Sequence, residues 1–286
     1  MSIVTLTTDM GEKDYYVASV KGRILTLCPQ AQIVDVTHLV SPFKIAQAAY
    51  LLKHCMGEFP MNTVHIIGVD GEPLVHFTQP EKSVYPTVLK YKGQYFVGAD
   101  NGVFSLILEN DEPEGIWRLD DVLSRPALMN FPTKNIFAPA ACNILNGKSI
   151  EDFATPVDSL KKAISLSPVI DGHVLRGVVV YIDHYGNAIT NISRSDFERI
   201  GKDVPFTIYF RRKEYYIDKI SGGYNEVAEG EKVAIFNDSG HLEIAINKGT
   251  PDNGGGANSL LGLRENDIVR VEFLPPGSRT TIDSLF

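Results

Sequence analysis

The sequence predicts an α/β N-terminal domain with a largely parallel sheet, followed by a C-terminal all-β, barrel-like domain. Three observations support this. The 286 residues are more than one core usually needs, since domains commonly hold about 100 to 150 residues. The first half alternates β-rich runs with helical patterns, whereas short β-rich runs follow one another after about residue 167. We therefore expect domains over residues 1–165 and 172–286, connected within 160–175.

Hydrophobic periodicity places the elements of the first half in order. The expected elements are a strand at 3–7, a helix at 15–27, a strand at 33–36, a helix at 42–56, a buried strand at 64–69, a hairpin of 87–91 with 94–96, and a helix at 136–145. The helix at 42–56 has the clearest apolar stripe. Ser41 is its expected N-cap, and Pro42 suits the first helical position.

The second half contains six short β-rich runs with turn residues between them. They are residues 177–182, 206–210, 215–217, 232–236, 242–246 and 267–273. This pattern favours a small barrel or sandwich.

The composition argues against nucleic-acid and membrane partners. The formal net charge is −8, whereas nucleic-acid binding depends largely on Lys and Arg side chains. No apolar stretch approaches the roughly 20 residues that span a bilayer, and residues 1–6 lack a basic flank, so we expect a cytoplasmic protein. Cys28, Cys55 and Cys142 form no CxxC pair, which favours buried, reduced thiols over a metal site.

Common catalytic signatures such as GxGxxG, GxSxG and HExxH are missing, but six short blocks form another pattern. The blocks are residues 6–11 (LTTDMG) with Asp14, 33–38 (IVDVTH), 98–102 (GADNG), 136–139 (IFAP), 183–187 (DHYGN) with 190–192 (TNI), and 237–245 (NDSGHLEIA). In order and approximate spacing they resemble the S-adenosylmethionine (SAM) hydrolase and fluorinase/chlorinase family. The resemblance implies SAM as the ligand, no metal or further cofactor, and a homotrimer with SAM between the N-terminal domain of one subunit and the C-terminal domain of its neighbour.

The resemblance also implies roles for individual residues in binding the nucleoside and the amino group. Asp9 matches the carboxylate that holds both ribose hydroxyls, and an ionised carboxylate has two acceptor oxygens for them. Asp14 and Asp183 match the acids that receive the methionine ammonium group. Asn187 matches the residue that reads the adenine edge with its donor and acceptor atoms.

Four further positions match binding residues of the family. Tyr185 matches an aromatic residue beside the adenine, and Phe43 one beside the ribose. Asp238 and Ser239 fall where the family binds the methionine carboxylate. Asp238 departs from the family pattern, because two facing carboxylates repel; Ser239 and backbone N–H groups then hold that carboxylate, or the amino-acid end of the ligand differs.

Most of these residues also have purely structural readings. Asp9 follows a strand and suits the cap of the next helix. The segments 183–187 and 237–240 are good turn sequences in their own right. His38 also follows a strand, where a lone histidine is more often hydrogen-bonded scaffolding than a catalyst.

The resemblance fails at the residues thought to activate water. Asp70 is kept, but the arginine expected shortly after it has no counterpart near Phe77, and Pro132 occupies the histidine position. Asp70 is therefore the expected base that orients water, and His76 is a candidate replacement partner. Thr133 aligns with a serine near the halide of the halogenases, and its hydroxyl suits water or an anion.

These residues lead to two readings from different classes. The first is a SAM hydrolase that gives adenosine and methionine, with Asp70, Thr133 and His76 as catalytic candidates. The second is a SAM or adenosine-binding protein that has lost the water-activating residues. Halogenation is a minor alternative, because the neighbouring halogenase features are not evident.

Overall fold

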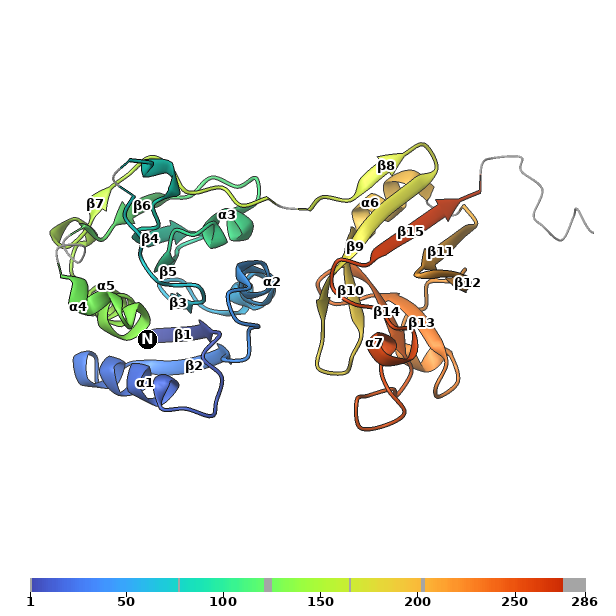
Figure 1. Ribbon diagram of the computed structural model, residues 1–286, viewed down its shortest axis with the longest axis horizontal. Coiled ribbons are helices and arrows are strands. Elements are labelled where there is room, and N and C mark those ends of the chain that lie inside the picture. The colour runs from blue at the N-terminus through green and yellow to red at the C-terminus, as the bar shows by residue number, and fades with distance from the viewer. Residues whose placement is uncertain (1, 77, 121–124, 165, 202–203, 275–286) are drawn as a thin grey trace, which may run out of the picture. The chain divides into compact units, whose positions relative to one another are not determined.

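The computed structural model describes residues 2–76, 78–120, 125–164, 166–201 and 204–274. The chain divides into two compact units, Met1–Ser165 and Leu166–Phe286 (Figure 1). Each unit has its own hydrophobic core.

The first unit is built on a seven-stranded sheet with the order β2-β1-β3-β5-β4-β6-β7. Its strands are β1 (Ile3–Thr8), β2 (Gln32–Thr37), β3 (Val64–Gly68), β4 (Pro86–Tyr91), β5 (Gln94–Ala99), β6 (Gly115–Arg118) and β7 (Thr155–Pro156). Strands β2, β1, β3 and β5 run parallel, and β4, β6 and β7 continue the sheet through antiparallel pairings. The predicted hairpin is confirmed as β4 and β5.

Helices cover both faces of this sheet, since neighbouring strand residues such as Ile66 and Ile67 belong to different apolar clusters. Helix α1 (Tyr16–Leu27) packs against α5 (Ala138–Leu145) on one face, and α2 (Ile45–Cys55) packs against α3 (Val103–Leu108) on the other (Figure 1). The shorter helical segments are η1 (Met56–Glu58), η2 (Pro80–Lys82), α4 (Pro126–Met129), the π-turn η4 (Thr133–Phe137) and η5 (Ile150–Asp152). The unit is a three-layer α/β sandwich, which confirms the predicted α/β domain.

The predicted start of the second helix is wrong. Helix α2 begins at Ile45 with Lys44 as its N-cap, so Ser41 is not the cap and Pro42 is not the first helical residue. Phe43 has a φ of 65°, in the left-handed region that interrupts a helix. Its backbone N–H donates to Asp9 Oδ2 at 2.9 Å, so a contact distant in sequence replaces the expected first turn.

The cysteines are free thiols. Cys28 and Cys142 are buried, as predicted, whereas Cys55 is only half-buried. Burial raises the pKa of each of the three, that of Cys142 to about 12, which keeps them protonated.

The second unit is an eight-stranded antiparallel sheet with the order β12-β11-β15-β9-β10-β14-β13, and β8 pairs with β9. The strands are β8 (Val169–Asp171), β9 (Val174–Ile182), β10 (Ala188–Ser193), β11 (Phe206–Phe210), β12 (Arg212–Ile217), β13 (Lys232–Phe236), β14 (His241–Ile246) and β15 (Ile268–Phe273). Three short helical segments accompany them, α6 (Arg194–Gly201), η6 (Tyr224–Glu226) and α7 (Ala257–Leu260). The sheet curves around a core that includes Leu175, Ile208, Ile244 and Val271, which gives the predicted barrel-like domain.

Candidate functional site

The parallel strands of the first unit bring three polar residues to one edge of the sheet. Asp9, Asp70 and Asn101 follow β1, β3 and β5 within a few residues, and these strands are neighbours in the sheet. Ligands of open α/β sheets bind at the carboxyl ends of such strands. This edge is therefore the candidate site of the first unit.

Asp9 is tied to the loop that carries Phe43. Its Oδ2 accepts the Phe43 N–H, and the left-handed backbone leaves the Phe43 ring exposed on the surface. The alternative role of Asp9 as a helix cap is wrong, because the N-cap of α1 is Tyr15 and no side chain caps that helix. Asp9 is thus available to a ligand through its remaining acceptor capacity.

Asp70 is held in a strained backbone conformation by Asn101. Its φ is 46°, which is uncommon for a residue other than glycine. Asn101 Nδ2 donates to the carbonyl oxygens of Val69 at 3.1 Å and Asp70 at 2.8 Å. Asn101 Oδ1 also accepts the Val103 N–H at the start of α3. Asn101 lies in a family-like block, but the sequence did not assign it this role.

The pKa of the Asp70 carboxyl is raised. Partial burial is the largest cause, and the negative charges of Asp9 and Glu72 add to it. The raised pKa makes Asp70 a stronger proton acceptor than an ordinary aspartate.

Thr133 lies beside Gly68, which ends β3 two residues before Asp70 in the chain. It is buried, and a Cβ added at Gly68 would come within 2.7 Å of Thr133 Oγ1. A Cβ added at Gly71 would come within 3.9 Å of Pro132 Cγ. The segment of Pro132 and Thr133 therefore lies beside the loop of Asp70, with Pro132 at the position of the family's histidine.

Two predicted site residues of this unit show no polar contact with the others. The backbone N–H of His76 donates to Ser83 Oγ, and within the described ranges no hydrogen bond or ion pair joins its ring to Asp70. Asp14 is exposed in the turn before α1.

His38 has the scaffolding role that the sequence left open. Its ring is buried, and Nδ1 lies 2.8 Å from Thr8 Oγ1. Nε2 lies 3.0 Å from Asp35 Oδ1. The His38 carbonyl accepts the Gly11 N–H, so His38 is bonded to residues on both sides of Asp9 in the chain, Thr8 and Gly11.

The second unit holds the remaining candidates, and Asp183 orders their loop. Asp183 Oδ1 accepts the backbone N–H groups of Tyr185 at 2.9 Å and Asn187 at 2.8 Å. Asp183 Oδ2 accepts Asn187 Nδ2 at 3.0 Å. This is the Asx-type turn that the sequence left as an alternative. The turn exposes the Tyr185 ring and buries Asn187.

Ser239 is linked to a buried glutamate that the sequence did not assign a role. Ser239 Oγ donates to Asn237 Oδ1 at 2.6 Å, and Asn237 Nδ2 donates to Glu243 Oε2 at 3.1 Å. Tyr224 OH donates to Glu243 Oε1 at 2.6 Å. Asp238 itself is exposed in the turn between β13 and β14.

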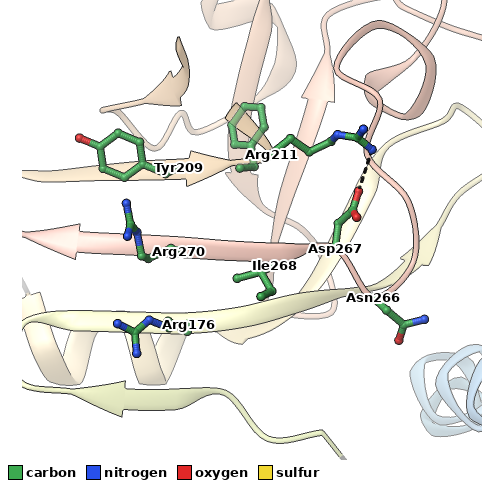
Figure 2. A pocket seen from close by; sticks show the side chains of 8 residues that line it. Arg176, Tyr209, Arg211, Asn266, Asp267, Ile268 and Arg270 are labelled. Carbon is green, nitrogen blue, oxygen red and sulfur yellow. Dashed lines mark hydrogen bonds and ion pairs between the residues drawn. The ribbon is translucent and has the colours of Figure 1, made fainter. Parts of the chain in front are cut away.

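A cavity of about 590 Å³ on the second unit lies apart from these residues in the chain (Figure 2). Arg176 and Arg270 lie opposite each other on β9 and β15, and Tyr209 lies beside Arg270 on β11. Arg211 lies farther along the cavity, next to Asp267. Each arginine has an acidic neighbour: Asp171 at 3.8 Å for Arg176, Asp267 at 3.4 Å for Arg211 and Glu272 at 3.1 Å for Arg270. The charges balance, and no predicted site residue lines the cavity.

No three His, Cys, Asp or Glu side chains in the described ranges are placed to hold a metal ion. Over the same residues, no helix has the length and apolar character needed to cross a membrane.

The fold and the two groups of side chains define a class: an α/β unit with an acidic strand-end site, joined to a β-barrel-like unit with an ordered Asp–Asn loop. Within that class, the chain belongs to the SAM hydroxide adenosyltransferase family. The family's N-terminal domain model matches residues 4–154, and its C-terminal domain model matches residues 177–270.

The chain is also similar to named relatives and to a solved structure. The chain is 33% identical to an (R)-S-adenosyl-L-methionine hydrolase of Methanocaldococcus jannaschii, over 68% of this chain and 69% of that protein. It is 28% identical to a Thermus thermophilus protein of the same name, over 95% of this chain and all of that one. The crystal structure of an uncharacterized conserved protein from Thermotoga maritima superposes with a TM-score of 0.80 at 29% identity, covering 94% of this chain and 99% of that chain.

Proposed function

We propose that this protein binds SAM and hydrolyses it at the ribose C5′ to adenosine and L-methionine. The names of the relatives point to the (R) epimer at sulfur as the preferred substrate. The observation that carries the proposal is the placement of Asp70 at the strand-end site: burial and the charge of Asp9 raise the pKa of its carboxyl, and Thr133 lies beside Gly68, two residues before Asp70 in the chain. Its acidic character suits a sulfonium cation.

The proposed reaction is a single displacement. Asp70 accepts a hydrogen bond from water and takes its proton as the water oxygen bonds to C5′. The C5′–S bond breaks, and its electron pair stays on sulfur, so methionine leaves as a neutral thioether that needs no acid. The proton on Asp70 then returns to solvent. Asp9 holds the ribose hydroxyls, which aligns C5′ with the water.

The remaining residues would bind the two ends of the substrate. Asn187 and Tyr185 would contact the adenine, and Phe43 the ribose. Asp14 and Asp183 would receive the ammonium group, and Ser239, with backbone N–H groups near Asp238, the carboxylate. We assign Thr133 a hydroxyl contact with the attacking water, and no role to His76.

The proposal includes a cytoplasmic homotrimer in which a site combines the first unit of one subunit with the second unit of its neighbour. A complementation experiment tests this. Asp9→Ala and Asn187→Ala proteins would each have low activity at SAM concentrations that saturate the wild type, but subunits exchanged between them would form some sites with neither substitution. Recovery of activity on mixing supports shared sites, whereas no recovery after proven exchange places each site within one subunit.

The direct test is a time course with purified protein and each sulfur epimer of SAM, analysed by liquid chromatography with mass detection against a protein-free control. Adenosine and methionine formed in equal amounts, before and after dialysis against EDTA, are the expected result. Binding of SAM without product would reject hydrolysis and favour a binding protein. The substitution of the family's histidine by Pro132 is the observation behind that second candidate.

A further inference from the structure

Glu243 is buried among polar partners in the second unit. It is the third residue of β14 and only 3% exposed, and an ionisable side chain is rarely so buried unless it is paired. Its two oxygens accept Tyr224 OH and Asn237 Nδ2, at 2.6 and 3.1 Å. No step of the proposed reaction uses it.

Glu243 lies between the two segments that are proposed to hold the ends of the substrate. On one side, Asn237 links Glu243 to Ser239, because its Oδ1 accepts hydrogen bonds from Ser239 Oγ and from the backbone N–H of His241. On the other side, the charge of Asp183 and a hydrogen bond from Asn187 both influence the pKa of the Glu243 carboxyl, which burial raises. The network thus extends from the Asp183 loop to Ser239.

This arrangement fixes the direction of the Asn187 side chain. Its Nδ2 donates to Asp183 Oδ2 at 3.0 Å. Glu243 lies opposite Ile189 in the pairing of β10 with β14, two residues along the chain from Asn187, and a hydrogen bond from the Asn187 side chain lowers the pKa of the Glu243 carboxyl. The carboxyl groups of Asp183 and Glu243 both accept from the amide nitrogen of Asn187, so the carbonyl oxygen Oδ1 is the atom left for a ligand. A carbonyl oxygen accepts a hydrogen bond from a base that carries an exocyclic amino group, and it repels a base with an oxo group at that position.

We infer that Glu243 is a positioning residue that orients Asn187, and thereby selects a 6-aminopurine nucleoside over its 6-oxo counterpart. The inference rests on the proposed function, since it names the specificity of that same site. Glu243 acts through Asn187 and is not itself in contact with the reacting atoms.

The experiment compares the binding of adenosine and inosine by isothermal titration, together with the kcat and KM for SAM. In wild-type protein we expect adenosine to bind at least 10-fold more tightly than inosine, because one site atom is left mispaired with inosine. In Glu243→Gln, one acceptor oxygen becomes a donor amide, and Asn187 loses its fixed direction. We expect the adenosine preference to shrink to about threefold or less, with a raised KM and a kcat within about twofold of wild type.

Two further variants keep the test decisive. Tyr224→Phe removes a partly exposed donor, is compatible with folding, and should reduce the adenosine preference in the same direction by a smaller factor. Thr190→Val is the structural control: Thr190 is buried on β10, and its hydroxyl donates to the Leu242 carbonyl. It should lower the melting temperature and leave the adenosine preference unchanged.

The outcomes separate the inference from the proposed function. Wild-type protein that binds neither SAM nor adenosine would overturn the proposed function. Equal binding of adenosine and inosine by wild type, or an unchanged preference in folded Glu243→Gln and Tyr224→Phe, would overturn the inference and leave hydrolysis intact.

Discussion

The side-chain amide of Asn101 donates a hydrogen bond to the backbone carbonyl of Asp70, at 2.8 Å. Asp70 has a left-handed backbone that costs about 1 kcal/mol or more, and such conformations persist only where surrounding contacts enforce them. A side chain on the loop after β5 therefore fixes the direction of the proposed base on the loop after β3.

Replacing Asn101 by Ala should lower turnover at least 10-fold, because Asp70 loses its alignment with the water, and should lower the free energy of unfolding by about 1 to 3 kcal/mol. Steady-state kinetics and urea unfolding measure the two effects. Asn101→Asp keeps the acceptor for Val103 but loses both donated bonds. Turnover close to wild type in Asn101→Asp would contradict the positioning role.

Replacing Asp9 by Ala should weaken SAM binding by about 10- to 100-fold, because an unpaired hydroxyl in a dry site costs about 1 to 3 kcal/mol. Titration calorimetry measures this directly. Asp120→Ala, which removes an acid paired with Arg118 in the same unit, should bind SAM normally. Unchanged affinity in Asp9→Ala would remove Asp9 from the site.

Replacing Glu72 by Gln should move the acid limb of the kcat/KM profile to lower pH. The charge of Glu72 is one cause of the raised Asp70 pKa, so its removal lets that pKa fall, and the base stays ionised in more acid solution. The shift should shrink at high salt, because Glu72 is exposed. Glu81→Gln serves as the control, and a limb that moves to higher pH would reject Asp70 as the base.

Replacing Gly68 by Ala should destabilise the first unit by about 1 to 3 kcal/mol. The new Cβ would come within 2.7 Å of Thr133 Oγ1 and 2.9 Å of Thr133 Cγ2, and Thr133 is too buried to move away freely. A second change, Thr133→Ala, removes both atoms and should recover part of the loss. Additive losses in chemical denaturation of the double variant would show that the two residues are not in contact.

Acid should destabilise the first unit through His65. This ring is buried between Thr5 and Gln94, and burial lowers its pKa from 6.5 to about 4. The folded state then binds the proton less tightly than the unfolded state, so stability is complete above pH 6.5 and falls by up to about 3 kcal/mol as the pH drops toward 4. Melting temperatures across that range should decline less steeply in His65→Phe, whereas His173→Gln, at an exposed position, should follow wild type.

Local hydrophobic periodicity was sufficient to predict the boundaries of an element where its residues contact neighbours that are close in sequence. Strands β11 and β13 were predicted to the residue, and the β4–β5 hairpin was predicted with its turn, although β5 extends three residues further, to Ala99. The start of α2 failed because Asp9, more than thirty residues away, holds Phe43 out of the helix. Such a contact leaves no local signal.

The polar residues also divide into those that a local sequence motif indicates and those whose role depends on contacts distant in sequence. Asp9, Asp183 and Asn187 belong to short blocks that the sequence displays. Asn101 and Glu243 lie in such blocks too, but their partners are a backbone carbonyl and a tyrosine that only folding brings near. Glu72 raises the pKa of Asp70 through its charge, and no rule of sequence spacing reveals such an effect.

The hydrogen bonds that Asp183 makes within its own loop have a thermodynamic consequence. Residues 183–187 are already fixed by three bonds to one carboxylate, so their conformational freedom is lost when the chain folds rather than when a ligand arrives. Association with a nucleoside should therefore carry little entropic penalty from this loop. The same rigidity gives a poorly fitting base no means of reshaping the loop around itself.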